Sequence, residues 1–195
     1  MSVKLLEDQN DVKYCMTKLE SRSQVTPDFP ERRKECNIPV FVYGTLKRGH
    51  SNHGVLNGAT FQTQGYITHR QEFGMRTVGT FPVVYRRSDI DENITGAAPR
   101  IMGELYSVDV AGLHQLDQLE GNGYLYQREQ VSILIQVGDG HYRAVTAWVY
   151  IGIDEAFDLA DLDKVPFETL QGSASIDWYP NEGLKASLQE KYKIN

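Results

Sequence analysis

The residues best suited to chemistry begin in one short stretch, FVYGTLKRG at positions 41–49. An apolar, β-branched and aromatic run ends there in a glycine, which predicts a strand that enters a turn. Beyond the last strand pair, backbone N–H groups have no ladder partner and can converge on an anion. A tyrosine hydroxyl, a threonine hydroxyl and two cations, Lys47 and Arg48, add side-chain donors. We therefore expect a carboxylate- or phosphate-binding loop, with an ordinary turn and solvated cations as the alternative.

A second candidate is Glu120, in the segment LDQLEGNG at 116–123. Apolar residues at helical spacing, an N-cap aspartate (Asp109) and a terminal glycine (Gly121) predict a helix that ends at Glu120. The carboxylate would then lie at the negative end of the helix dipole, which raises its pKa, as burial would. An acid tuned toward neutrality can accept and return a proton near physiological pH. The residues alone leave a purely structural glutamate open.

Strands are the elements that must position these two segments. Besides the run at 40–43, β-branched and aromatic residues predict strands at 60–69, 81–86, 101–108, 127–137 and 141–151. Glycines at 137–141 predict a hairpin turn between the last two. Several strands with few helices predict an α+β domain with a curled, barrel-like sheet. After Gly152 we expect an acidic, irregular tail, in which 182–193 is a candidate final helix.

Residues 1–37 differ in character from the rest and predict an N-terminal arm, helical or extended, before one domain over 38–195. Apolar residues at imperfect helical spacing are followed by a polar linker with Pro27 and Pro30. We favour a helix packed on the domain, or a frayed terminus, over a partner-binding element.

The composition, 41% hydrophobic and 24% charged, is that of a soluble globular protein. A net charge of −6 disfavours binding to nucleic acid or to an anionic membrane, and no apolar run has the length of a membrane span or signal peptide. Cys15 and Cys36 lack motif spacing, so we expect a cytoplasmic protein. His50 and His53 have no cysteine or carboxylate at zinc-like spacing, so we expect a solvated loop and no metal.

Four motifs follow one another in a specific order: YGTLKRG at 43–49, GELYSVD at 103–109, LDQLEG at 116–121 and LYQRE at 125–129. In this combination they resemble the γ-glutamylcyclotransferase-like (AIG2-like) superfamily, most closely its γ-glutamylamine cyclotransferase branch. The segment FPVV at 81–84 is similar to the strand that this family has between the motifs. The segment SIDW at 175–178 is similar to a Ser-Gly-Asp-Trp element, with Ile176 in place of glycine, which leaves the local turn open.

The resemblance implies a fold and a set of site residues. The fold is a small mixed β-barrel flanked by a few helices, without metal or cofactor. The YGTL loop would cradle the α-carboxylate of a γ-glutamyl group, and Glu120 would be the general acid/base. We also expect Tyr126 in the pocket, although a half-buried strand aromatic is the alternative. The expected substrate-binding residues are Tyr43, Gly44, Thr45, Leu46 and Tyr126.

These roles predict an enzyme that closes a γ-glutamyl amine or γ-glutamyl peptide to 5-oxoproline and releases the free amine. The expected partner is therefore a small molecule, while the leaving amine and the oligomeric state stay open. One alternative is a binding protein that sequesters a small anionic ligand in the same loop, with Lys47, Arg48 and His50 facing a phosphate or a nucleotide-like ligand. A second is an interaction protein whose arm docks a partner.

Overall fold

The computed structural model describes residues 37–69, 72–78, 80–87, 99–138, 140–157, 163–164, 168–170 and 173–179. The predicted N-terminal arm up to residue 36 and the candidate helix at 182–193 lie outside this part of the chain. The domain boundary at residue 37 therefore stays a prediction.

The described residues form strands, two α-helices and one 3-10 helix. The strands are β1 (Ile38–Val42), β2 (Thr60–Ile67), β3 (Phe73–Val78), β4 (Phe81–Arg86), β5 (Arg100–Val108), β6 (Tyr126–Gln136), β7 (Tyr142–Gly152), β8 (Asp163–Lys164), β9 (Glu168–Leu170) and β10 (Ser173–Ile176). The helices are η1 (His53–Leu56), α2 (Val110–Glu120) and α3 (Asp154–Phe157). All six predicted strands are confirmed, with ends shifted by at most two residues. The expectation of an irregular tail after Gly152 is wrong, because α3 and β8–β10 lie there.

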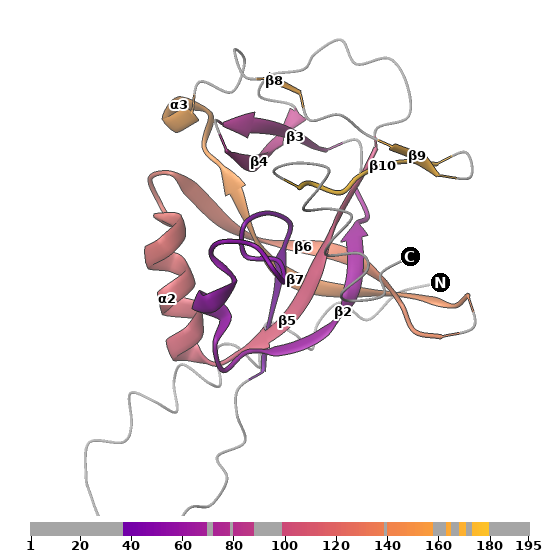
Figure 1. The fold of residues 1–195 in the computed structure, drawn as a ribbon, viewed down its shortest axis with the longest axis horizontal. Coiled ribbons are helices and arrows are strands. Elements are labelled where there is room, and N and C mark those ends of the chain that lie inside the picture. Colours follow the sequence, from indigo (N-terminus) through magenta and orange to yellow (C-terminus); the bar gives the residue numbers. More distant parts are fainter. Residues whose placement is uncertain are drawn as a thin grey trace, which may run out of the picture.

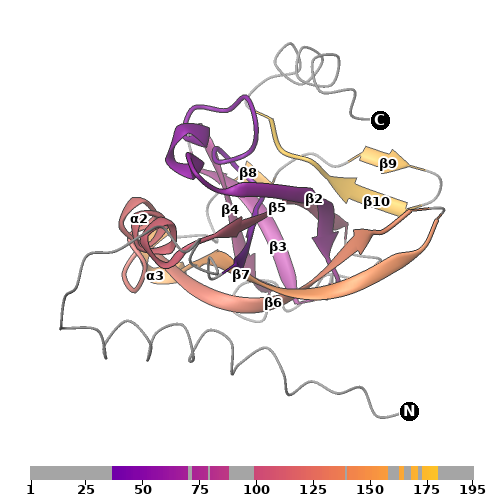
Figure 2. The ribbon, with the colours of Figure 1, turned by 90° about the horizontal axis from the view of Figure 1, so that it is seen from below.

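Five strands close into a barrel in the order β1-β7-β6-β2-β5, and β5 pairs again with β1 (Figures 1 and 2). β1 runs parallel to β7, where Val40 faces Trp148, and antiparallel to β5, where Val42 faces Glu104. The barrel is therefore mixed. β5 continues beyond it and pairs in parallel with β10, with Ile101 opposite Ile176. The predicted α+β class with a small mixed barrel and few helices is confirmed.

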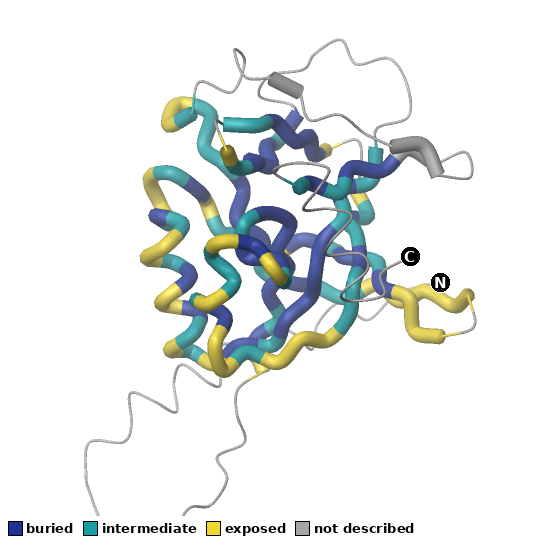
Figure 3. Tube along the Cα trace, viewed as in Figure 1, coloured by how far each residue is buried: buried dark blue, intermediate teal, exposed yellow. Residues whose placement is uncertain are grey.

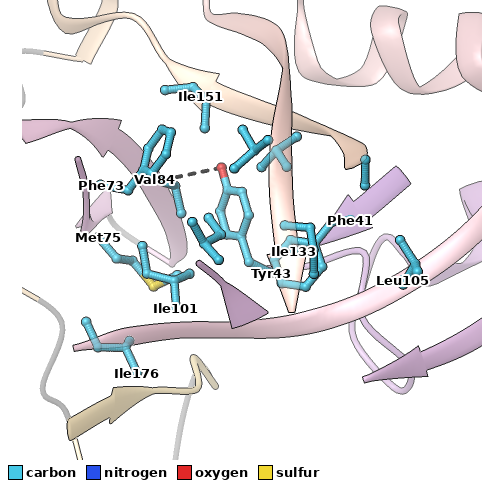
Figure 4. Packing of buried hydrophobic residues seen from close by; sticks show 14 of the residues in the cluster. Phe41, Tyr43, Phe73, Met75, Val84, Ile101, Leu105, Ile133, Ile151 and Ile176 are labelled. Atoms are coloured by element: carbon cyan, nitrogen blue, oxygen red, sulfur yellow. Dashed lines mark hydrogen bonds between the residues drawn. The ribbon is translucent and has the colours of Figure 1, made fainter. Parts of the chain in front are cut away.

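The alternation of side chains along β1 links two hydrophobic cores. Phe41 points into the barrel interior, where it joins Ile133 and other buried residues (Figure 4). Val40 and Val42 point the other way, into a cluster that includes Leu116 of α2. A strand that is apolar at every position is thus explained by burial on both faces, and α2 covers the outer one. Figure 3 shows the buried residues concentrated in the barrel, while the start of β2 and the β6–β7 hairpin are exposed.

The turn between β6 and β7 is the hairpin that the glycines predict. The Val137 N–H donates to the His141 carbonyl over 2.9 Å. Gly138 and Gly140 have φ angles of 99° and 78°, a left-handed conformation that other residues rarely adopt. The hairpin end projects from the barrel and is exposed (Figure 3).

A second sheet, in the order β4-β3-β8, packs over one end of the barrel (Figure 1). Phe73, Met75 and Val84 from this sheet belong to the same buried cluster as the barrel interior. The sheet therefore caps the barrel and brings the start of β4 next to the loop that follows β1. None of the described helices has the length and apolar character needed to span a membrane.

Candidate active site

Helix α2 places Glu120 at its last position. The Asp109 side chain caps the helix by accepting a hydrogen bond from the Gly112 N–H over 2.7 Å. Gly121 ends the helix with φ 58° and ψ 48°, the left-handed geometry of a C-terminal glycine. Leu113 and Leu116 are buried against the barrel, which fixes the face that α2 turns inward. The predicted start and end of this helix are both confirmed.

The last turn of α2 is tied to the barrel by an ion pair. Both oxygens of Asp117 accept from the Arg128 Nη1, over 2.8 and 2.6 Å. The Tyr150 hydroxyl donates to the same carboxylate over 2.8 Å, and the Arg128 N–H donates to the Asn122 side chain over 2.8 Å. These bonds hold the helix end, and with it Glu120, against β6 and β7.

The loop after β1 is held by its own hydrogen bonds. The Lys47 N–H donates to the Gly44 carbonyl over 3.0 Å, which closes a tight turn. Asn52 donates to Thr45 twice, from its backbone N–H to the carbonyl and from its side chain to the hydroxyl, each over 3.0 Å. The backbone N–H groups of Thr45 and Leu46 donate to no described residue. They remain available to an anion in a loop that is otherwise fixed.

Pro82 of β4 lies directly on this loop. A Cβ atom on Gly44 would come within 2.9 Å of the Pro82 Cγ atom, closer than real Cβ contacts allow. Only glycine therefore fits at position 44 without displacing the loop or the start of β4.

The two cations of the loop do not face an open site. Lys47 is 4% exposed, and its Nζ donates to Asp177 over 2.6 Å and to the Trp178 carbonyl over 2.7 Å. Arg48 donates to Glu104 from its backbone N–H over 2.9 Å and from Nε over 3.0 Å. The expectation that these side chains supply donors to an anion is wrong. Their ion pairs also weigh against a phosphate-binding protein, since that alternative relied on them.

His50 is buried rather than solvated. It is 8% exposed, and its ring lies 5.6 Å from that of Trp178 and 5.3 Å from that of Tyr179, between ring centroids. Burial, and then the nearby Lys47 ammonium, lowers the pKa of His50 to about 4. The imidazole is therefore neutral at physiological pH, and the predicted solvated loop is wrong at this residue. Among the described residues, no three His, Cys, Asp or Glu side chains gather as metal ligands would.

A cavity of about 520 Å³ joins the two predicted segments. Every predicted site residue lines it: Tyr43, Gly44, Thr45, Leu46, Glu120 and Tyr126. Sequence reasoning missed several other lining residues, among them Phe81, Leu125, Tyr150, Phe157 and Trp178. Trp178 belongs to the SIDW segment, so its motif was a usable signal. The others reach the cavity through tertiary packing, for which no local pattern exists.

Burial raises the pKa of Glu120 to about 7. The direction agrees with the prediction, and the cause is burial, which the sequence analysis names beside the helix dipole. The Glu120 carboxylate accepts no hydrogen bond from any described residue. At physiological pH, the acid that faces the cavity is therefore about half protonated, and its oxygens remain free to bond to a ligand.

Two tyrosines lie near this acid and differ in their roles. The Tyr43 hydroxyl donates to the Tyr150 carbonyl over 2.7 Å and accepts from the Val84 N–H over 3.3 Å (Figure 4). Both hydrogen bonds of the Tyr43 hydroxyl are thus made to backbone groups, and they fix this part of the cavity wall. Burial and the nearby Glu120 raise the pKa of the Tyr126 hydroxyl, so it stays protonated. Tyr126 is the one of the two whose hydroxyl bonds to no described residue.

The barrel places this protein in a known structural class. The crystal structure of an AIG2-like protein from Mus musculus matches with a TM-score of 0.50 and 24% identity, over 75% of this chain and 97% of that chain. The family described as gamma-glutamyl cyclotransferase, AIG2-like, matches residues 40–171. The chain belongs to this family, and it is a γ-glutamylcyclotransferase-type enzyme.

Two relatives from Danio rerio illustrate the similarity. Gamma-glutamylaminecyclotransferase A is 37% identical over 133 residues, which is 67% of this chain and 77% of that protein. Gamma-glutamylaminecyclotransferase C is 33% identical over 158 residues, which is 79% of this chain and 95% of that protein.

Proposed function

We propose that this enzyme closes the γ-glutamyl part of a γ-glutamyl amine to 5-oxoproline and releases the free amine. The observation that carries the proposal is Glu120, a half-buried acid with a pKa of about 7 in the same cavity as the YGTL loop. The Danio rerio relatives are named for action on γ-glutamyl amines, which supports the same substrate class.

In this proposal the loop binds the α-carboxylate of the substrate. The N–H groups of Thr45 and Leu46 are the donors, because the loop's own hydrogen bonds leave them unused. Gly44 supports them by allowing the close approach of Pro82. Tyr126 lines the cavity near Glu120, where its hydroxyl can donate to the substrate.

The chemical step is an intramolecular aminolysis with Glu120 as general acid/base. The Glu120 carboxylate takes one proton from the substrate α-ammonium, and the resulting amine attacks the γ-carbonyl carbon. A C–N bond forms and closes the five-membered ring. Glu120 then gives its proton to the amide nitrogen as the original C–N bond breaks. The ring nitrogen then passes its second proton through the same carboxylate to the released amine, so the products are 5-oxoproline and an alkylammonium ion.

The protein's main task is to hold one folded rotamer of the substrate. Nucleophile and electrophile belong to the same molecule, so orientation supplies much of the rate. A loop fixed by internal bonds and an acid fixed by the Asp117–Arg128 pair suit that task. The proposed steps need neither a metal nor a cofactor.

The test is the release of 5-oxoproline by purified protein from γ-glutamyl-ε-lysine and γ-glutamyl-alanine. We expect Glu120→Gln to abolish release while the fold, followed by circular dichroism, is unchanged. Glu155→Gln is the matched control, since Glu155 is exposed on α3 and does not line the cavity. Substantial turnover by Glu120→Gln would refute the role of this carboxylate.

A further inference from the structure

Much of the cavity wall is apolar. The large apolar side chains from outside the loop that line it include Phe81, Leu119, Leu125 and Phe157. Phe81, Leu125 and Phe157 pack on the core beneath α2 yet remain partly exposed, and Leu119 is 40% exposed. Apolar surface left open inside a concave site is a feature of ligand recognition.

The described part of this wall carries almost no charge. Among the described residues that line the cavity, Glu120 is the only acid, and none is a lysine or arginine. His50 also lines the cavity, but it is neutral because its pKa lies at about 4. Lys47 and Arg48, the nearest loop cations in sequence, bind Asp177 and Glu104.

The apolar wall is preformed by packing between elements. The rings of Tyr126 and Phe157 lie 5.1 Å apart between centroids, tilted by 60°. The Ile153 N–H donates to the Leu125 carbonyl over 3.0 Å, which ties the start of α3 to the segment before β6. Aromatic surface fixed in this way binds a ring at a low entropic cost.

The two halves of a γ-glutamyl amine make different demands on this cavity. The polar glutamyl half takes the loop N–H groups and Glu120, so the apolar wall remains for the leaving amine. A carboxylate on the leaving amine close to the scissile bond would lose water and find no lysine or arginine among the described lining residues. An apolar ring there would cover the exposed surface of Phe81, Leu125 and Phe157. Removing this apolar surface from water would stabilise the bound substrate.

We infer that the leaving group is an arylalkylamine with no charged group besides its amine nitrogen, rather than an amino acid, an inference that rests on the proposed function. The apolar wall is thus a specificity subsite for the amine side of the scissile bond. The reaction is the same aminolysis, with the arylalkylamine as the group that leaves.

Three matched substrates test this subsite: γ-glutamyl-phenethylamide, γ-glutamyl-ethylamide and γ-glutamyl-phenylalanine. The second lacks the ring of the first, and the third adds only a carboxylate beside the amide nitrogen. We expect kcat/KM for 5-oxoproline release to be at least about tenfold higher for the phenethylamide than for either of the others. γ-Glutamyl-ε-lysine is measured in parallel as an independent probe of cyclotransferase activity.

The possible outcomes separate the inference from the proposed function. If the ethylamide, the phenylalanine derivative or γ-glutamyl-ε-lysine is turned over as well as the phenethylamide, the subsite is overturned while the cyclotransferase stands. If none of the four releases 5-oxoproline, the proposed function fails and the subsite with it.

A charge placed on the wall gives a second test. Leu119→Lys adds a cation at an exposed position of the cavity rim, where it can pair with the carboxylate of γ-glutamyl-phenylalanine. We expect the preference for the phenethylamide over this substrate to fall by at least about threefold. Gln118→Lys is the matched control, because Gln118 is exposed on the same helix and does not line the cavity. An unchanged preference in Leu119→Lys would contradict the assigned subsite.

Discussion

At the scale of single residues, the cavity sets the protonation of Glu120 through burial. A carboxyl with a pKa of about 7 is half ionised near neutral pH, so it can serve as base and then as acid in one turnover. A fully solvated glutamate would stay ionised there and would return its proton poorly. The desolvation of one side chain thus suits it to both proton transfers of the proposed reaction.

The pH dependence of turnover follows from this pKa. Glu120 must be ionised to accept the first proton, so activity is lost as pH falls through about 7. We expect kcat/KM to drop about tenfold for each pH unit below that value. The measurement is the rate of 5-oxoproline release between pH 5 and 9, with circular dichroism at each pH. A flat profile between pH 5 and 7 in folded protein would contradict this assignment.

Gly44 offers a test of the loop at the same scale. In Gly44→Ala the new methyl group meets Pro82, so the loop or the start of β4 must shift. We expect KM to rise by about tenfold and the free energy of unfolding to fall by about 1–3 kcal/mol. Gly54→Ala is the matched control, because nothing lies within 4 Å of a Cβ at that position. Equal kinetics in the two variants would argue against a binding role for the loop.

At the scale of elements, the Asp117–Arg128 pair couples α2 to the barrel. In Asp117→Asn the Arg128 guanidinium loses its ionic partner, and the end of the helix loosens. We expect kcat to fall by about tenfold, because a small misplacement of a catalytic group is costly, and stability to fall by about 1–3 kcal/mol. Asp109→Asn makes the same change at the other end of α2 and should be near neutral, since asparagine also caps helices well. Wild-type kcat in Asp117→Asn would show that this pair does not position Glu120.

The strength of local signals decided which elements could be predicted from the sequence. β4–β7 and α2 carry long apolar patterns, a hairpin turn or caps, and each was predicted close to its observed range. β3 was missed because Gly74 and Arg76 interrupt its apolar pattern, and both are buried by tertiary packing instead. The short strands β8 and β10 form through their pairing with β3 and β5, and β9 forms through its pairing with β10, which no local pattern encodes.

At the scale of the whole molecule, residues late in the sequence stabilise the loop that follows β1. Asp177 and the Trp178 carbonyl hold the buried ammonium of Lys47, and Trp178 also lines the cavity. Sequence reasoning found the YGTL loop and Glu120, but it assigned Lys47 to solvent or ligand. The reason is that the spacing of residues within a motif cannot reveal a partner that lies 130 positions away in the sequence.

This ion pair predicts the effect of removing one partner. Asp177→Leu leaves the Lys47 charge buried without its counterion, so we expect a loss of up to about 3 kcal/mol in urea unfolding. The double variant Lys47→Met, Asp177→Leu should recover most of that loss, because an apolar pair of similar size replaces a buried ion pair at little cost. A single variant as stable as the wild type would show that the pair is dispensable.

The closure of the barrel also has a consequence for folding kinetics. β1 comes first among the barrel strands but pairs with β5 and with β7, so Val40 meets Trp148 only after most of the domain has been synthesised. Contacts between residues so distant in sequence form slowly, since a long loop must close first. The cavity is complete only after that step, because Tyr150 of β7 lines it together with the loop that follows β1. A nascent chain that lacks β7 therefore has neither a closed barrel nor a binding site, and the catalytic competence of this enzyme appears all at once.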